Sequence, residues 1–133
     1  MRRAYIFGMD PGGHRLHALA LPRQPWRAGN SEVNGLEACD TGIAVATAGV
    51  ADVHVVRSVR TPGSTPSARL APLGELLFVF VLAGALDIEG DAGNAANACG
   101  HHRLSVGDSC VILADAAFSL RASGGMSMLK VAL

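Results

Sequence analysis

The sequence is poor in aromatic side chains, net charge and long hydrophobic runs, and the last two shortages each exclude a class of protein. Its 133 residues include one Trp, one Tyr and four Phe, and 11 basic side chains are balanced by 11 acidic ones. A chain without surplus basic charge releases few counterions from nucleic acid, so we expect no nucleic acid partner. Because charge keeps small domains apart in solution, the same balance predicts an oligomer.

No apolar segment is long enough to suggest a membrane protein. The densest run, from Leu76 to Leu82, has seven residues, whereas a transmembrane helix needs roughly 20. The apolar stretch near Met1 is interrupted by Gly8 and Asp10 before the core of a signal peptide can form. The sequence therefore predicts a cytoplasmic protein with no membrane partner.

Cysteine is also scarce, and its spacing favours free thiols. The three cysteines, Cys39, Cys99 and Cys110, are odd in number and include no C-x-x-C pair. This pattern predicts neither a disulfide framework nor a dithiol redox motif. Cys110 begins the apolar run that ends at Leu113, so we expect it to be a small core residue.

What the chain does contain is enough apolar side chain to fold. Half of its residues are hydrophobic and the mean hydropathy is +0.32, so residues 1–133 are expected to form one domain that buries roughly two thirds of its surface. Short apolar segments separated by turn residues predict an all-β fold. Residues 1–35 form an N-terminal arm with a candidate strand at His14 to Leu21, and residues 36–133 form a barrel. Ile43 to Thr47 is predicted to be one of its strands.

The segment from Glu75 to Leu82 carries the strongest strand signal. Leu77, Val79 and Val81 alternate with large apolar residues, so both faces of this strand are apolar. Only one face can meet the core of a single β domain. We therefore expect a homodimer in which the N-terminal strands cross to the partner or cover the face of Phe78 and Phe80.

The segment from Glu75 to Gly84, followed by Leu104 to Leu113 with its Gly107-Asp108 turn, resembles the two consecutive motifs of the cupin superfamily. The resemblance implies a single antiparallel double-stranded β-helix, the jelly-roll barrel. In that family, three histidines and a glutamate hold a divalent metal inside the barrel. Counting from Gly84 and Gly107 places those ligand positions on Leu77, on Phe118, and on Ala71 and Leu73 or Leu70 and Pro72.

None of these side chains coordinates a metal, so the usual cupin metal site is expected to be absent, with no metal and no cofactor. The interior becomes apolar, which leaves two alternatives. Either side chains fill the barrel, or it accepts a small apolar or weakly anionic ligand. The predicted pocket is lined by Leu77, Val79, Cys110, Ile112, Phe118 and His54. The leading interpretation is a metal-free small-molecule-binding or accessory barrel.

His54 supports an alternative function. It lies in the middle of a predicted strand, two residues after Asp52 on the same face. An imidazole oriented by a carboxylate can act as a general base near neutral pH. The alternative is therefore a small-metabolite enzyme of the isomerase, epimerase, decarboxylase or dioxygenase type, with His54 and Asp52 as catalytic candidates. The simpler interpretation is a hydrogen-bonded strand histidine, and a subunit of a larger assembly is a third possibility. His101 and His102 are predicted to be surface residues that point to opposite faces of one strand.

Overall fold

The structure is a computed structural model that describes residues 3–10, 13–20, 25–28, 35–59, 65–90 and 100–133. The described chain contains twelve strands and one short helix. In chain order the elements are β1 (Arg3–Asp10), β2 (Gly13–Ala20), β3 (Arg27–Ala28), β4 (Leu36–Asp40), α1 (Ile43–Ala46), β5 (Asp52–Ser58), β6 (Ser67–Leu70), β7 (Leu76–Ala83), β8 (Ala85–Gly90), β9 (His101–Ser105), β10 (Ser109–Leu113), β11 (Phe118–Ala122) and β12 (Ser127–Ala132).

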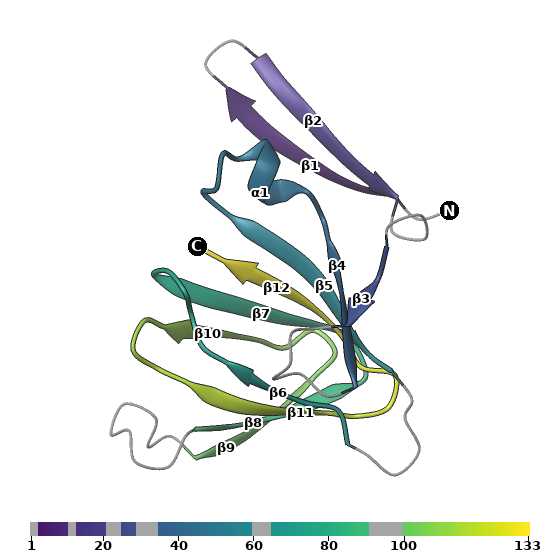
Figure 1. Cartoon of the computed structure of the whole chain (residues 1–133), viewed down its shortest axis with the longest axis vertical. Helices are drawn as coiled ribbons and strands as arrows, with labels where there is room; N and C mark the ends of the chain where they lie inside the picture. Colours follow the sequence, from purple (N-terminus) through teal and green to yellow (C-terminus); the bar gives the residue numbers. More distant parts are fainter. Residues whose placement is uncertain (1–2, 11–12, 21–24, 29–34, 60–64, 91–99) are drawn as a thin grey trace.

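The strands form three antiparallel sheets, of which the two larger make the barrel (Figure 1). The six-stranded sheet has the order β10-β7-β12-β5-β4-β3, and the four-stranded sheet has the order β6-β11-β8-β9. From β5 to β12 the chain passes repeatedly from one sheet to the other, as it does in a jelly roll. The predicted all-β jelly-roll barrel is confirmed.

The core lies between the two larger sheets. The residues that fill it are buried and apolar, and they include Val79 and Val81 from β7, Leu86 from β8 and Leu120 from β11. Each of these four side chains is 0% exposed. The alternation predicted for the Glu75 to Leu82 segment places one apolar face of β7 in this core.

The other face of β7 lies on the outside of the six-stranded sheet. Phe78 is opposite Val111 of β10, and Phe80 is opposite Leu129 of β12. Both phenylalanines are half-buried. At the β10 edge, Val111 and Leu113 are 55% and 62% exposed. The outer face of β10, β7 and β12 is therefore an apolar surface. We call its five residues the outer patch: Phe78, Phe80, Val111, Leu113 and Leu129.

The prediction that Ile43 to Thr47 forms a strand is wrong, because this segment forms α1 and the turn that follows. Gly42, with φ of 75°, turns the chain away from β4, and its N–H donates to Asp40 Oδ1 at 2.8 Å. Thr47 then ends the helix, since its hydroxyl donates to the Ile43 carbonyl at 2.8 Å and its N–H donates to the same oxygen. An apolar run of this length does not distinguish a strand from a helical turn by periodicity.

The N-terminal arm contains more strand than the sequence suggested. The candidate strand at His14 to Leu21 corresponds to β2, which pairs along its whole length with the unforeseen β1. These two strands form a separate two-stranded sheet. β3 pairs with β4 and so extends the six-stranded sheet. Among the described residues, no helix has the length and apolar character needed to cross a membrane.

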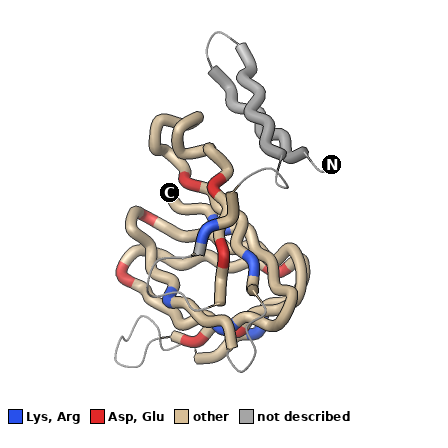
Figure 2. Tube along the Cα trace, turned by 45° about the vertical axis from the view of Figure 1, so that its right-hand side comes forward, with Lys and Arg blue, Asp and Glu red and all other residues tan. Residues whose placement is uncertain are grey.

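The charged residues are spread over the described chain, with basic and acidic positions interspersed (Figure 2). Arg57 illustrates their local pairing. Its guanidinium lies 2.9 Å from Glu37 Oε2 on the neighbouring strand and 3.8 Å from the centre of the Trp26 ring. This arrangement ties the segment before β3 to the outer side of β5.

Candidate functional site

A cavity of about 340 Å³ lies between β9 and β10, where the unpaired edges of the two larger sheets meet. Apolar side chains from β8, β9, β10 and β11 contribute to its wall, and polar groups stand on the β9 and β10 side. The lining residues are Ile88, His102, Arg103, Leu104, Ser109, Cys110, Val111, Ile112 and Phe118. The volume falls within the range of small-molecule pockets, which are mostly apolar with a few polar groups.

Cys110 contributes a half-buried thiol to this wall. Burial raises the pKa of Cys110 above its ordinary value. The thiol is therefore neutral near pH 7 and behaves as a small apolar group rather than as a thiolate nucleophile. This is the behaviour expected of a cysteine that lines an apolar pocket.

The structure brings together three of the six residues predicted to line a pocket. Cys110, Ile112 and Phe118 line the cavity. Leu77 and Val79 pair with Ile112 and Cys110 across the β7–β10 ladder, but their side chains belong to the core and are 3% and 0% exposed. His54 lies on β5 and is not among the lining residues.

The positions that correspond to the cupin metal ligands are distributed over the core, the cavity and the surface. Leu77 and Leu70 are buried in the core. Phe118 borders the cavity. Leu73 is fully exposed after β6. Phe118 packs against the core cluster that contains Leu70 and Leu77 and is the ladder partner of Leu70, whereas Leu73 lies outside this cluster.

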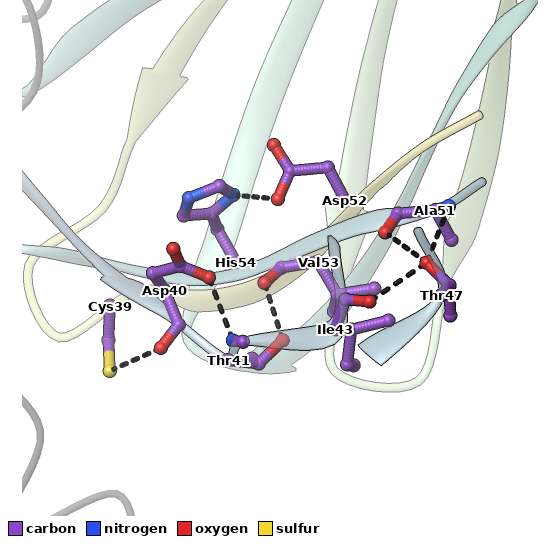
Figure 3. A network of polar contacts seen from close by, with 10 residues as sticks. Cys39, Asp40, Thr41, Ile43, Thr47, Ala51, Asp52, Val53 and His54 are labelled. Carbon is purple, nitrogen blue, oxygen red and sulfur yellow. Dashed lines mark hydrogen bonds and ion pairs between the residues drawn. The ribbon is translucent and has the colours of Figure 1, made fainter. Parts of the chain in front are cut away.

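Asp40, Asp52 and His54 form a polar group where β4 ends and β5 begins (Figure 3). The Nδ1 atom of His54 is 3.4 Å from Asp52 Oδ1, and Asp40 is the direct partner of His54 in the β4–β5 ladder. One possible ligand atom from each of these three residues lies within 4.8 Å of the other two. His54 and Asp52 are therefore adjacent, as the sequence suggested, and Asp40 joins them.

The end of β4 is fixed in place by hydrogen bonds around Asp40. The Gly42 N–H holds one carboxylate oxygen of Asp40, and both the N–H and the hydroxyl of Thr41 donate to the Val53 carbonyl, at 3.1 and 2.7 Å (Figure 3). Asp40 also acts on Cys39: burial, and then the negative charge of Asp40, raise the pKa of the Cys39 thiol, against a smaller lowering by Arg57.

Sequence reasoning missed Asp40 because it stands at the end of a strand that was not predicted. The short segment Leu36–Asp40 carries no clear alternation, and only its register on β5 places Asp40 beside His54. If β4 had been predicted, its pairing with β5 would have placed Asp40 opposite His54.

The two adjacent histidines of β9 point in different directions, as predicted. His101 Nε2 is 3.2 Å from Asp87 Oδ1, and Arg103 is 3.3 Å from the other oxygen of that carboxylate. His102 borders the cavity. Cys99, which precedes them in the sequence, lies outside the described residues.

Comparisons with known proteins show the fold of the chain. No protein-family model matches the sequence. No curated protein matches it significantly either. Among solved structures, KdgF from Halomonas sp. has a TM-score of 0.57 at 15% identity, covering 83% of this chain and 87% of KdgF.

Two further structures resemble most of the chain. A sugar phosphate isomerase of the cupin superfamily from Silicibacter pomeroyi has a TM-score of 0.58 at 22% identity, covering 85% of this chain and 73% of that protein. A Salmonella typhimurium protein assigned to ethanolamine utilization has a TM-score of 0.62 at 12% identity, covering 99% of this chain and 95% of that protein. The jelly-roll barrel observed here, together with these likenesses, shows that the chain has the fold of the cupin superfamily.

Proposed function

We propose that this protein is a small-molecule-binding barrel whose ligand occupies the cavity between β9 and β10. The observation that carries the proposal is an apolar cavity of about 340 Å³ between two sheet edges, with Phe118, Ile112 and Cys110 in its wall. Burying an apolar ligand against these walls is favourable by about 25 cal/mol per Å² of apolar surface removed from water.

The polar groups of the cavity suggest what else the ligand carries. His102 and Ser109 stand on the two strands that border the cavity, and both side chains can donate a hydrogen bond to an anionic or carbonyl oxygen. A ligand with a small apolar body and one weakly anionic end fits this distribution. Its apolar body would lie against Phe118 and Ile112.

Two matched probes test this proposal. Benzoate and benzyl alcohol share an apolar ring, but only benzoate is anionic. Ligand-observed NMR on the purified chain should detect binding of both, with benzoate the tighter. In Cys110→Phe the new ring occupies the cavity, and binding should fall by about tenfold or more. Val106→Phe is the control, because Val106 is 63% exposed and does not line the cavity.

Undiminished binding to Cys110→Phe would place the probes elsewhere and overturn the proposal. Failure of both probes to bind the unmodified chain would count against it equally. Native mass spectrometry supplies an independent test, since a ligand retained during purification would add mass to the unmodified protein and not to Cys110→Phe.

A small-metabolite enzyme is the second candidate, and the Asp52–His54 contact of 3.4 Å is the observation that favours it. Asp52 would orient the imidazole, and His54 would act as a general base. In a screen of small sugar phosphates and hydroxy acids, a turnover that His54→Gln abolishes and Glu37→Gln retains would support this candidate.

We also propose that the protein is a homodimer whose copies meet through the outer patch. Exposed Val111 and Leu113 continue the half-buried Phe78 and Phe80 into one apolar surface on adjacent strands. A second copy can cover this surface with an equivalent one, as a two-fold interface requires. Light scattering after size-exclusion chromatography should give the dimer mass, and the double variant Val111→Lys/Leu113→Lys should give the monomer mass. A monomeric unmodified chain would refute this proposal.

A further inference from the structure

We propose that Asp40, Asp52 and His54 bind a divalent metal ion, for which Mn²⁺ or Zn²⁺ is suited. This metal site uses none of the positions at which the cupin motifs place their ligands, and none of its residues lines the cavity. The inference is therefore independent of the proposed small-molecule ligand, and the two can be tested separately.

Two neighbouring strands and the start of the following turn build the site. Asp52 and His54 are two residues apart on β5, so their side chains leave the same face of the sheet. Asp40 is opposite His54 on β4, which puts its carboxylate on that face as well. All three residues are held by the β4–β5 ladder, whose end is secured by the two hydrogen bonds from Thr41 to Val53.

The distances fit a first-row metal ion. Two ligand atoms that each lie about 2.1 Å from a tetrahedral ion are roughly 3.4 Å apart, and the His54 Nδ1 to Asp52 Oδ1 distance is 3.4 Å. One possible ligand atom from each of Asp40, Asp52 and His54 lies within 4.8 Å of the other two. Asp40 is exposed, so a small rotation of its carboxylate can close the remaining gap without disturbing the core.

The electrostatics and exposure suit a cation that keeps some water. Asp40 and Asp52 supply two negative charges, and the neutral imidazole supplies a nitrogen donor. The His54 side chain is 27% exposed and that of Asp52 is 49% exposed, so the ion would retain water in its remaining positions. Carboxylate and water ligands suit Mn²⁺, and imidazole suits Zn²⁺.

Two features distinguish this group from a chance pair of surface acids. The imidazole is partly buried and oriented by Asp52, and the Gly42 N–H positions the Asp40 carboxylate at 2.8 Å while leaving its second oxygen available. Lys130 opposes binding, because it is the β12 partner of His54 and stands on the same face. Its positive charge should weaken the site without contributing a ligand.

Mn²⁺ is the probe of choice, because the protein also contains cysteines and Mn²⁺ prefers oxygen and imidazole ligands to thiols. The loss of the free Mn²⁺ signal in electron paramagnetic resonance measures binding to the full chain. We expect one ion per chain, and at least a tenfold loss of affinity in His54→Gln and in Asp52→Asn. In NMR spectra, sub-stoichiometric Mn²⁺ should broaden the His54 ring protons first.

The chain offers a matched control in the His101–Asp87 pair. Its nitrogen and oxygen are 3.2 Å apart, but Arg103 lies against the other carboxylate oxygen and would repel a cation. His101→Gln should therefore bind Mn²⁺ like the unmodified chain. If His101→Gln loses the ion while His54→Gln retains it, or if the unmodified chain binds none, the proposal is overturned.

Lys130→Met tests the site without removing a ligand. Loss of one positive charge near a divalent ion should tighten binding by up to about tenfold. Thermal melting without metal shows whether each variant is folded, so a loss of binding caused by unfolding is recognised directly. Unchanged Mn²⁺ affinity in Lys130→Met would contradict the placement of the ion on this face.

Discussion

Gly84 offers the most direct test of how the barrel turns between its two sheets. It connects β7 in one sheet to β8 in the other, with φ of +66°. A Cβ atom built on Gly84 would lie 2.8 Å from Met126 Cα and 3.0 Å from Met126 N. Gly84→Ala therefore forces a side chain into both a left-handed conformation and a contact with backbone atoms.

The neighbouring backbone cannot move away without losing hydrogen bonds. The Met126 N–H donates to Ser58 Oγ at 2.9 Å, and the Met126 side chain is 1% exposed. The left-handed conformation costs an alanine about 1 to 2 kcal/mol. Overpacking against a fixed neighbour adds about 1 to 3 kcal/mol. We expect Gly84→Ala to lower the free energy of unfolding by about 3 kcal/mol.

Gly107→Ala is the control that separates these two contributions. Gly107 has φ of +88°, but a Cβ atom there meets nothing within 4 Å. The free energy of unfolding of this variant should fall by only about 1 kcal/mol, because the left-handed backbone conformation is the only unfavourable change. Urea denaturation measures both values, and calorimetry should show a melting temperature lower by roughly 10 °C for Gly84→Ala. Equal losses of unfolding free energy in the two variants would show that the contact between the new Cβ atom and Met126 costs nothing, and would refute the reasoning.

Two further predictions concern Cys110 and Arg57. Burial raises the pKa of Cys110 in the folded chain, so the unfolded thiol ionises first and the free energy of unfolding falls as the pH rises above about 8.5. Urea denaturation between pH 7 and pH 10 should show a shallower fall in Cys110→Ala, and an identical fall would contradict the burial argument. Arg57→Ala removes the cation above Trp26, so it should change the emission of the sole tryptophan. It should lower the free energy of unfolding by only about 1 kcal/mol, because the ion pair with Glu37 is partly exposed to water.

The barrel strands could be predicted because the order of apolar residues within each segment is enough to indicate a strand. In β7 the alternation of large apolar residues predicted a strand with a buried inner face, and the structure places Leu77, Val79 and Val81 in the core. The glycine that ends this strand could likewise be foreseen, because a corner between two sheets needs a backbone that few residues adopt. Local pattern therefore sufficed for the central strands of the barrel.

The candidate sites could not be predicted to the same extent, because they depend on pairing between segments. Asp40 belongs to a five-residue strand without alternation, and its proximity to His54 exists only in the β4–β5 register. The cavity depends on how far the edges of β9 and β10 stand apart, a distance that no side-chain pattern encodes. The strand predicted at Ile43 to Thr47 was wrong for a local reason. The hydrogen bonds from Thr47 to Ile43 stabilise a helical turn and outweigh the strand preference of the β-branched residues in this segment.

One row of residues across the six-stranded sheet connects the two proposals. Cys110, Val79, Lys130, His54 and Asp40 are successive Cα partners from β10 to β4. The row begins at the cavity, passes through the buried core at Val79 and ends in the polar group, four strand spacings away, which is up to roughly 19 Å. A ligand that fills about 340 Å³ at the β10 edge does not reach an ion bound at Asp40 of β4, because packed side chains separate them. The changes in the free energy of unfolding caused by Cys110→Phe and by Asp52→Asn should therefore be additive in the double variant. A large coupling between them would mean that the cavity and the polar group are connected through the barrel interior.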